Sequence, residues 1–193
     1  MACETLALGG MSVGCRDGIG GIKKAYFTDK ANVETVSVDT DTTASTFNMI
    51  TAMTMATGTT WYAYNFRKNT SDYTSTVTVD DSIGTFAVET VLNLQFSNMD
   101  AYKRNSLQAL CERDTVCIVE DAKGRFWFFG ETYPLAPTTA TVNSGKAAAD
   151  GNLGNVSLST TDSFLPHGIV DTLFNTTIKP LIVDPDDASN GNA

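Results

Sequence analysis

The stretch Phe86-Ala-Val-Glu-Thr-Val-Leu-Asn-Leu-Gln-Phe96 decides the fold of this chain, because apolar and polar side chains alternate along it. A pleated strand points successive side chains to opposite faces, so this period of two predicts one long β-strand. Its apolar face carries, besides Thr90, the expected core residues Phe86, Val88, Leu92, Leu94 and Phe96. Its other face carries Glu89, Asn93 and Gln95, which are typical of a solvated sheet surface.

Residues 73–79 are the expected partner of this strand. Their side chains fall into two rows, with Tyr73, Ser75, Val77 and Val79 in one and Thr74, Thr76 and Thr78 in the other. The segment Asp80-Asp-Ser-Ile-Gly-Thr85 between the two strands has the composition of a turn. The pattern therefore predicts a long β-hairpin.

Shorter runs bounded by turn residues indicate further strands. They are expected at residues 22–27, 33–38, 47–55, 60–66, 115–120, 125–129, 156–159 and 177–183. Residues 115–120 and 125–129 are apolar on both faces, which favours a buried place in the middle of a sandwich. Prolines and small residues after Gly130 predict a long loop through residue 152.

One helix is expected among the strands. Ser97 or Asn98 would act as its N-cap, Asp100 would lie in its first turn, and the pattern ends at Glu112. The side chains expected to pack on the sheet are Met99, Tyr102, Leu107 and Leu110. These elements predict a mainly β fold, either a β-sandwich or a split barrel, with one flanking α-helix.

Three regions are expected along the 193 residues. Residues 1–21 are rich in glycine and have no apolar period, which predicts a flexible N-terminal arm. Residues 22–183 are expected to form a single β-rich domain, since a chain of this length can bury one core. Residues 184–193 are rich in aspartate and predict a disordered acidic tail.

The charge balance excludes a basic clamp for nucleic acid. The chain has 13 lysine and arginine residues against 22 aspartate and glutamate residues, which gives a net charge of −9. Tight binding to phosphates needs clustered cations, so this chain would repel a polyanion. No window is apolar enough to span a membrane and no export signal is visible, so we expect no membrane partner.

Catalysis has no visible apparatus in this sequence, and we expect neither enzymatic activity nor a cofactor. The single histidine, His167, lies in a Leu-Pro-His-Gly segment that is typical of a turn. A hydrolase would need His167 beside Ser163 or Asp162, and this stays a minor alternative.

The four cysteines fit no metal pattern. The spacing of Cys3, Cys15, Cys111 and Cys117 matches neither a C-x-x-C motif nor a set of zinc ligands. Cys111 and Cys117 are expected as small, reduced core residues. Whether Cys3 and Cys15 are bridged stays open.

A second function class is a carbohydrate-binding β-sandwich on a phage or cell-surface fibre. Aromatic side chains on strands can stack on sugar rings, and this role would need Trp61 or Trp127 to be exposed. Core packing is the more common fate of strand aromatics and is expected for Trp61, Tyr62, Tyr64, Phe126, Trp127, Phe128 and Phe129.

The order of elements resembles that of the phage tail-tube proteins, a family related to the inner-tube subunits of contractile injection systems. The resemblance lies in the early strand Gly20-Gly-Ile-Lys-Lys-Ala-Tyr-Phe27, the hairpin 73–96, the helix 98–112, the hairpin 116–129 and the tract Asn143-Ser-Gly-Lys-Ala-Ala-Ala-Asp150. It covers residues 20–183. It implies a structural virion protein, assembled in the host cytoplasm, whose hexameric rings stack into a tube with other phage tail proteins as partners.

In such a tube, long strands of neighbouring subunits form a continuous barrel through which double-stranded DNA passes without specific binding. The resemblance therefore places the polar rows of the long hairpin toward the lumen. The residues concerned are Thr74, Thr76, Thr78, Glu89, Asn93 and Gln95. The sequence leaves open the ring size, the tail type and the host. It also leaves open whether the chain is the tube subunit or a terminator, neck or baseplate ring.

Overall fold

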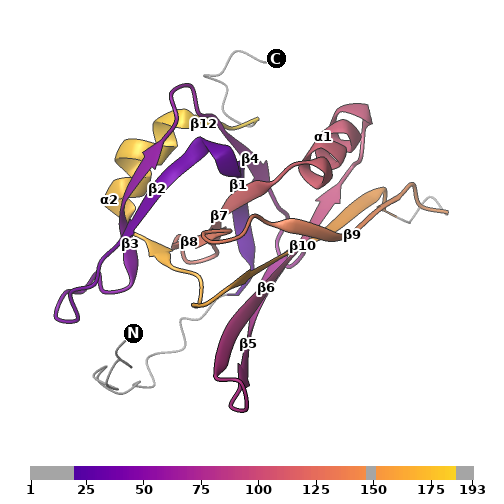
Figure 1. Ribbon diagram of the computed structural model, residues 1–193. Helices are drawn as coiled ribbons and strands as arrows, with labels where there is room; N and C mark the ends of the chain where they lie inside the picture. Colours follow the sequence, from indigo (N-terminus) through magenta and orange to yellow (C-terminus); the bar gives the residue numbers. More distant parts are fainter. Residues whose placement is uncertain (1–19, 147–150, 186–193) are drawn as a thin grey trace.

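The computed structural model of the protein describes residues 20–146 and 151–185, which form two β-sheets (Figure 1). The eight-stranded sheet contains, in spatial order, β12 (Ile182–Val183), β4 (Trp61–Asn65), β1 (Ile22–Asp29), β7 (Thr115–Asp121), β8 (Phe126–Phe129), β11 (Gly168–Ile169), β3 (Met49–Met55) and β2 (Val33–Val38). The four-stranded sheet contains β5 (Asp72–Asp80), β6 (Thr85–Ser97), β10 (Leu153–Asp162) and β9 (Ala136–Asn143).

The first core lies between the two sheets. Phe27 and Cys117 of the eight-stranded sheet share one buried cluster with Leu92, Leu94 and Leu158 of the four-stranded sheet. The helix α1 (Ala101–Glu112) closes one end of this core with Leu107 and Leu110. The fold is therefore a mainly β sandwich with a flanking helix, and the predicted fold class is confirmed.

The second core lies on the other face of the eight-stranded sheet. It is covered by a helical segment made of α2 (Asp171–Leu173), the π-helix η2 (Phe174–Ile178) and the 3-10 turn η3 (Lys179–Leu181). Phe174 and Ile178 of this segment belong to the same buried cluster as Trp61 and Phe128. A further 3-10 turn, η1 (Lys30–Asn32), connects β1 to β2.

The strand β7 contributes to both cores. All seven of its residues are buried, with Cys117 and Val119 in the first cluster and Val116 and Ile118 in the second. The sequence predicted a central, doubly buried position for this segment, and the order of strands confirms it.

The long hairpin predicted from the sequence is formed by β5 and β6. Their antiparallel register pairs Tyr73 with Leu92 and Val79 with Phe86. β6 has 13 residues, and its turn end extends beyond the body of the sandwich (Figure 1). α1 lies at the opposite end of the ribbon (Figure 1).

Three residues that the sequence analysis expected to pack in the core or against it are exposed instead: Phe86, Tyr102 and Tyr62, the last of which is 54% exposed. Phe86 is 51% exposed, although Val88, Leu92 and Leu94 on the same face are buried and Phe96 packs against the core. Alternation identifies the inward face of a strand but does not tell where the opposing sheet ends. The expectation that Phe86 lies in the core was wrong for this reason.

The helix also begins later than predicted. Its N-cap is Asp100, whose side chain accepts a hydrogen bond from the Lys103 N–H at 2.8 Å, and not Ser97 or Asn98. Met99, Leu107 and Leu110 are buried, but Tyr102 is 79% exposed. Five residues of α-helix separate Tyr102 from Leu107, a rotation of about 140° that carries the tyrosine away from the sheet. The packing role expected for Tyr102 was therefore wrong.

Two further segments differ from expectation. Residues 136–143, predicted as part of a loop, form β9, and most of residues 177–183, predicted as a strand, belong to η2 and η3. The predicted arm lies outside the described residues up to position 19, and the predicted tail does so from position 186. Asp184, at the start of that tail, accepts a hydrogen bond from Lys24 Nζ at 2.5 Å.

Candidate functional site

The outer face of the four-stranded sheet carries the polar rows predicted from the sequence. Thr74, Thr76, Thr78 and Glu89 are exposed, whereas Asn93 and Gln95 are half-buried. The register places Thr76 opposite Glu89, and β10 continues the surface on the other side of β6. We call this surface the outer polar face, formed by Thr74, Thr76, Thr78, Glu89, Asn93, Gln95, Asn155, Ser157 and Thr161.

Two side-chain hydrogen bonds run across the outer polar face. Gln95 Nε2 donates to Asn155 Oδ1 at 3.0 Å, and Ser157 Oγ donates to Asn93 Oδ1 at 2.9 Å. Both bonds connect neighbouring strands, β6 and β10, at directly paired positions. The amides are therefore held along the surface of the sheet, where each still has hydrogen-bonding capacity for water or a partner.

The four-stranded sheet carries no positive charge. The sequences of β5, β6, β9 and β10 contain neither lysine, arginine nor histidine, whereas Asp72, Asp80, Glu89 and Asp162 supply negative charge. Binding to nucleic-acid phosphates depends on cations that displace counterions. This surface can therefore face a polyanion without adhering to it.

Both edges of the four-stranded sheet are open. Within the described residues, β5 pairs only with β6, and β9 pairs only with β10. All eight residues of β9 are exposed and uncharged, and β5 is uncharged between Asp72 and Asp80. Isolated proteins usually protect such edges with lysine, proline, a bulge or a covering element. In the described residues, β9 has Pro137 and an irregular register opposite Ser157 and Leu158, and α1 lies close to it.

The turn end of the β5–β6 hairpin presents apolar side chains to solvent. We call these residues the hairpin tip: Val77, Val79, Ile83 and Phe86. Ile83 is 71% exposed, and Val79 and Phe86 form a cross-strand pair with no opposing sheet. Asp80 closes the turn by accepting hydrogen bonds from the N–H and the hydroxyl of Ser82. The tip is thus an ordered apolar surface.

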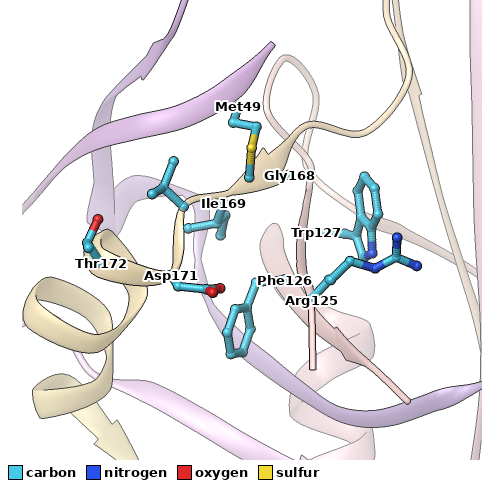
Figure 2. A pocket seen from close by; sticks show the side chains of 9 residues that line it. Met49, Arg125, Phe126, Trp127, Gly168, Ile169, Asp171 and Thr172 are labelled. Atoms are coloured by element: carbon cyan, nitrogen blue, oxygen red, sulfur yellow. The ribbon is translucent and has the colours of Figure 1, made fainter. Parts of the chain in front are cut away.

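A pocket of about 290 Å³ lies beside β8 and β11, and Figure 2 shows its lining. Met49, Phe126 and Ile169 supply apolar walls. The Arg125 guanidinium lies 5.6 Å from the centre of the Trp127 ring and pairs with Asp121 Oδ2 through Nε at 2.9 Å. One face of Trp127 is therefore already occupied by a side chain of the protein.

The other tryptophan is unavailable for stacking on a sugar. Trp61 is 0% exposed and its Nε1 donates to Met55 Sδ at 3.1 Å. Because the carbohydrate-binding alternative needs an open tryptophan face, neither tryptophan favours it.

The carboxylate beside the pocket has a structural role in the β7–β8 turn. Asp121 accepts hydrogen bonds from the N–H groups of Lys123 and Arg125, at 2.8 and 2.9 Å. Burial alone would raise the pKa of Asp121, but hydrogen bonds from Arg125, Trp127 and Lys123 outweigh it and lower the pKa below its usual value. Gly124 completes the turn with a φ of 80°, as its place in the sequence suggested.

His167 does not form the arrangement that the hydrolase alternative required. Its Nδ1 lies 2.8 Å from Glu131 Oε2, and its ring stacks on Phe164 with centroids 4.5 Å apart. Asp162 instead accepts a hydrogen bond from the Thr132 N–H at 3.0 Å. The histidine is thus held by residues other than Ser163 and Asp162.

The described cysteines pack in or against the first core and are not grouped with other metal-binding side chains. Cys117 lies in the core and Cys111 packs against it, and burial raises the pKa of both thiols. Cys3 and Cys15 lie outside the described residues. Among the residues that the structure does describe, no three His, Cys, Asp or Glu side chains are grouped as metal ligands. None of the helices in that part of the chain has the length and apolar character needed to cross a bilayer.

These features define a β-sandwich in which the eight-stranded sheet has a buried core on each face. The four-stranded sheet has a core on one face only, and within the described residues neither of its edge strands has a further strand partner. Comparison with protein-family models, curated proteins and solved structures finds no match.

The prediction from the sequence identified the outer polar face but did not identify two other parts of the four-stranded sheet, the strand β9 and the hairpin tip. It assigned β9 to a loop, although Thr139, Thr141 and Asn143 alternate with Ala140 and Val142. It also placed Phe86 in the core, so the exposed hairpin tip was not foreseen. The high β-branched content of residues 138–142 was the signal that could have identified the second edge.

Proposed function

We propose that this chain is a structural subunit that joins copies of itself through the edges of the four-stranded sheet, forming rings that stack into a tube. The observation that carries the proposal is the pair of open edges on opposite sides of one sheet: β9, which has no charged residue, and β5, which has none between Asp72 and Asp80. An unpaired edge of this kind invites pairing with another strand. Closed pairing between identical subunits satisfies both edges at once.

The direction of the strands supports such a ring. Each neighbouring pair in the order β5-β6-β10-β9 is antiparallel, so β5 and β9 run in opposite directions. When copies are related by rotation about one axis, β9 of one copy meets β5 of the next in antiparallel orientation. Four strands per subunit therefore give a barrel that alternates in direction without a break.

The charge distribution supports an inward orientation of the outer polar face. A lumen lined by threonine, asparagine and glutamine, with Glu89 as its charge, would be wet and would not retain DNA. The first core on the opposite face then supports the barrel from outside. This is the role of a tail-tube subunit or a related ring of a phage tail, with double-stranded DNA passing through in the virion.

Electron microscopy of the purified chain tests the proposal. Negative staining over a range of concentrations should show rings or tubes, and light scattering should show a mass that rises with concentration. A protein that stays monomeric under all these conditions would refute the proposal.

A matched pair of lysine variants tests the edge contact. Thr139→Lys places a charge on the open edge strand β9, and Thr161→Lys places the same charge on the inner strand β10. The first variant should lose assembly while its urea midpoint stays near that of the wild type, since surface substitutions change stability by about 0.5 kcal/mol or less. The second should still form rings. Equal assembly by both variants would contradict pairing through β9.

A further inference from the structure

We propose that the acidic tail of this chain, residues 184–193, binds the loop between β4 and β5 in the same molecule. We call residues 66–71, which carry Arg67 and Lys68, the basic loop. The inference goes beyond the proposed function, because it assigns a partner within one chain to an exposed part of the eight-stranded sheet.

The first residue of the acidic tail is anchored at the end of β4. Asp184 Oδ2 accepts a hydrogen bond from Lys24 Nζ at 2.5 Å, and Asp184 Oδ1 accepts one from Asn65 Nδ2 at 3.2 Å. Asn65 is the last residue of β4, and the basic loop begins at the next position. The acidic tail therefore starts directly beside the basic loop.

The direction of the chain also leads the acidic tail to the basic loop. β12 pairs in parallel with the first residues of β4, so the chain travels toward the carboxyl end of β4 as it approaches Asp184. Asp186 and Asp187 follow two and three residues later, and three residues span at most about 10 Å. Because Pro185 lies in a turn, the two aspartates stay close to the anchored residue.

The charges of the two segments are complementary. The acidic tail has three aspartates and neither lysine nor arginine. Arg67 and Lys68 are exposed, and within the described residues neither side chain has a hydrogen bond or an ion pair. Carboxylates that reach these two cations would form charge-assisted hydrogen bonds with them.

The lysines of the neighbouring strand β1 already have acidic partners. Lys23 Nζ lies 2.6 Å from Glu120 Oε1, and Lys24 pairs with Asp184. The exposed acid next to the basic loop is Asp72, at the start of β5. One carboxylate beside two unpaired cations leaves the basic loop with a net positive charge, which favours binding of the next aspartates of the acidic tail.

The tail of the same molecule is favoured over other acidic partners. A tethered segment that begins beside its binding site has an effective concentration in the millimolar range, which a second copy does not reach in dilute solution. Two cations are also few for a nucleic acid, whose binding depends on several phosphate contacts. The acidic tail of the same chain is therefore the occupant that this geometry selects.

Binding of the acidic tail would also cover part of the β4 edge. Within the described residues, β12 pairs with β4 at Trp61 and Tyr62, and residues 63–65 have no strand partner on that side. An open edge of this kind can pair with another chain. A tail held at the basic loop would lie beside these residues and hinder such pairing.

Zero-length crosslinking of the full chain tests the contact. A carbodiimide joins a carboxylate directly to an amine, so it should link Asp186 or Asp187 to Lys68. Lys179, exposed and also close to the tail along the chain, is the internal control. Peptide mass spectrometry should find the Lys68 link in at least about tenfold excess over a Lys179 link, because the tail is held at one site. Equal yields at the two lysines would refute the proposal.

A matched pair of arginine variants tests the role of charge. Arg67→Glu leaves the reacting amine of Lys68 in place and should lower the yield of the link about fivefold, the scale expected for an exposed ion pair. Arg104→Glu makes the same charge change on exposed α1 and should leave the yield unchanged. An equal effect of both variants would contradict binding at the basic loop.

Isotope mixing identifies the molecule that supplies the tail. When unlabelled and nitrogen-15-labelled chains are mixed before crosslinking, the link should join peptides of the same label. Links between unlike labels would assign the tail to a second copy and refute the proposal. Since the link can be measured in any oligomeric state, its failure and the absence of rings are separate results.

Removal of the tail charges tests whether the β4 edge is covered. Asp186→Ser/Asp187→Ser should increase light scattering from irregular aggregates, because the edge of β4 is then free to pair. Asp81→Ser/Asp114→Ser removes the same charge from two exposed positions elsewhere and should behave like the wild type. Equal scattering from the two double variants would contradict the covering of this edge.

Discussion

The two sheets of this sandwich differ in how completely the single chain covers them. The eight-stranded sheet has a core on each face, whereas the four-stranded sheet has a core on one face only. Phe128, in the first sheet, is 2% exposed, and Phe86, in the second, is 51% exposed. The difference indicates that the single chain buries both faces of the first sheet, while it leaves one face and the hairpin tip of the second sheet exposed to solvent.

The largest change in the free energy of unfolding is expected when a phenylalanine of the eight-stranded sheet is replaced by alanine, and the same replacement in the four-stranded sheet is its control. Phe128→Ala removes a fully buried ring and should lower the free energy of unfolding by about 3–5 kcal/mol. Phe86→Ala removes an exposed ring and should lower it by less than about 1 kcal/mol. Urea unfolding followed by tryptophan fluorescence measures both. Comparable losses would show that the hairpin tip is covered within one chain and would remove the contrast between the sheets.

A second comparison concerns the aspartates that close one turn in each sheet. Asp121 is buried and accepts hydrogen bonds from two backbone N–H groups, so Asp121→Asn should cost about 1–3 kcal/mol at pH 7. The exposed Arg125 side chain adds little to this value. Asp80 closes its turn in full contact with solvent, and Asp80→Asn should have a smaller effect.

The pH dependence of Asp121 sharpens this comparison. Its pKa is lowered in the folded protein, so its carboxylate contributes stability above the unfolded value of about 3.9. That contribution is lost as the pH falls through the folded pKa. The stability difference between the wild type and Asp121→Asn should therefore shrink below about pH 4 in urea titrations. A difference that stays constant down to pH 3 would contradict the assignment.

The smallest change in the free energy of unfolding is expected for substitutions on the outer polar face. Gln95→Ala removes the hydrogen bond to Asn155 and should change the free energy of unfolding by no more than about 0.5 kcal/mol. Ser157→Ala, which removes the hydrogen bond to Asn93, serves as an independent measurement on the same face. A loss above 1.5 kcal/mol in either variant would mean that this row of amides is needed for folding rather than for a surface role.

The sequence predicted the strands that have a clear covered side. In β6 the alternation around Val88, Leu92 and Leu94 identified the inward face, and in β7 the unbroken apolar run indicated burial on both faces. β9 was missed for the opposite reason. All eight of its residues are exposed, so its apolar row is reduced to Ala140 and Val142, which is too short to stand out from the surrounding loop residues.

Two other differences arise from tertiary packing. The β-branched residues near Ile178 favoured a strand, but Phe174 and Ile178 are four residues apart and are buried together when the segment is helical. Phe86 of the hairpin tip follows the same alternation as the rest of β6, and nothing in the local sequence marks the point at which the opposing sheet stops. The outer polar face could therefore be predicted from the sequence, whereas the exposed hairpin tip could not.

The position of β7 has a consequence for how the molecule loses its structure. Since Cys117 and Val119 face one core while Val116 and Ile118 face the other, neither core can come apart and leave this strand in place. Heating should therefore give one sharp calorimetric peak, with the van't Hoff enthalpy equal to the calorimetric enthalpy. A substitution that unfolds the second core should therefore also unfold the four-stranded sheet, although the two lie on opposite faces of the eight-stranded sheet.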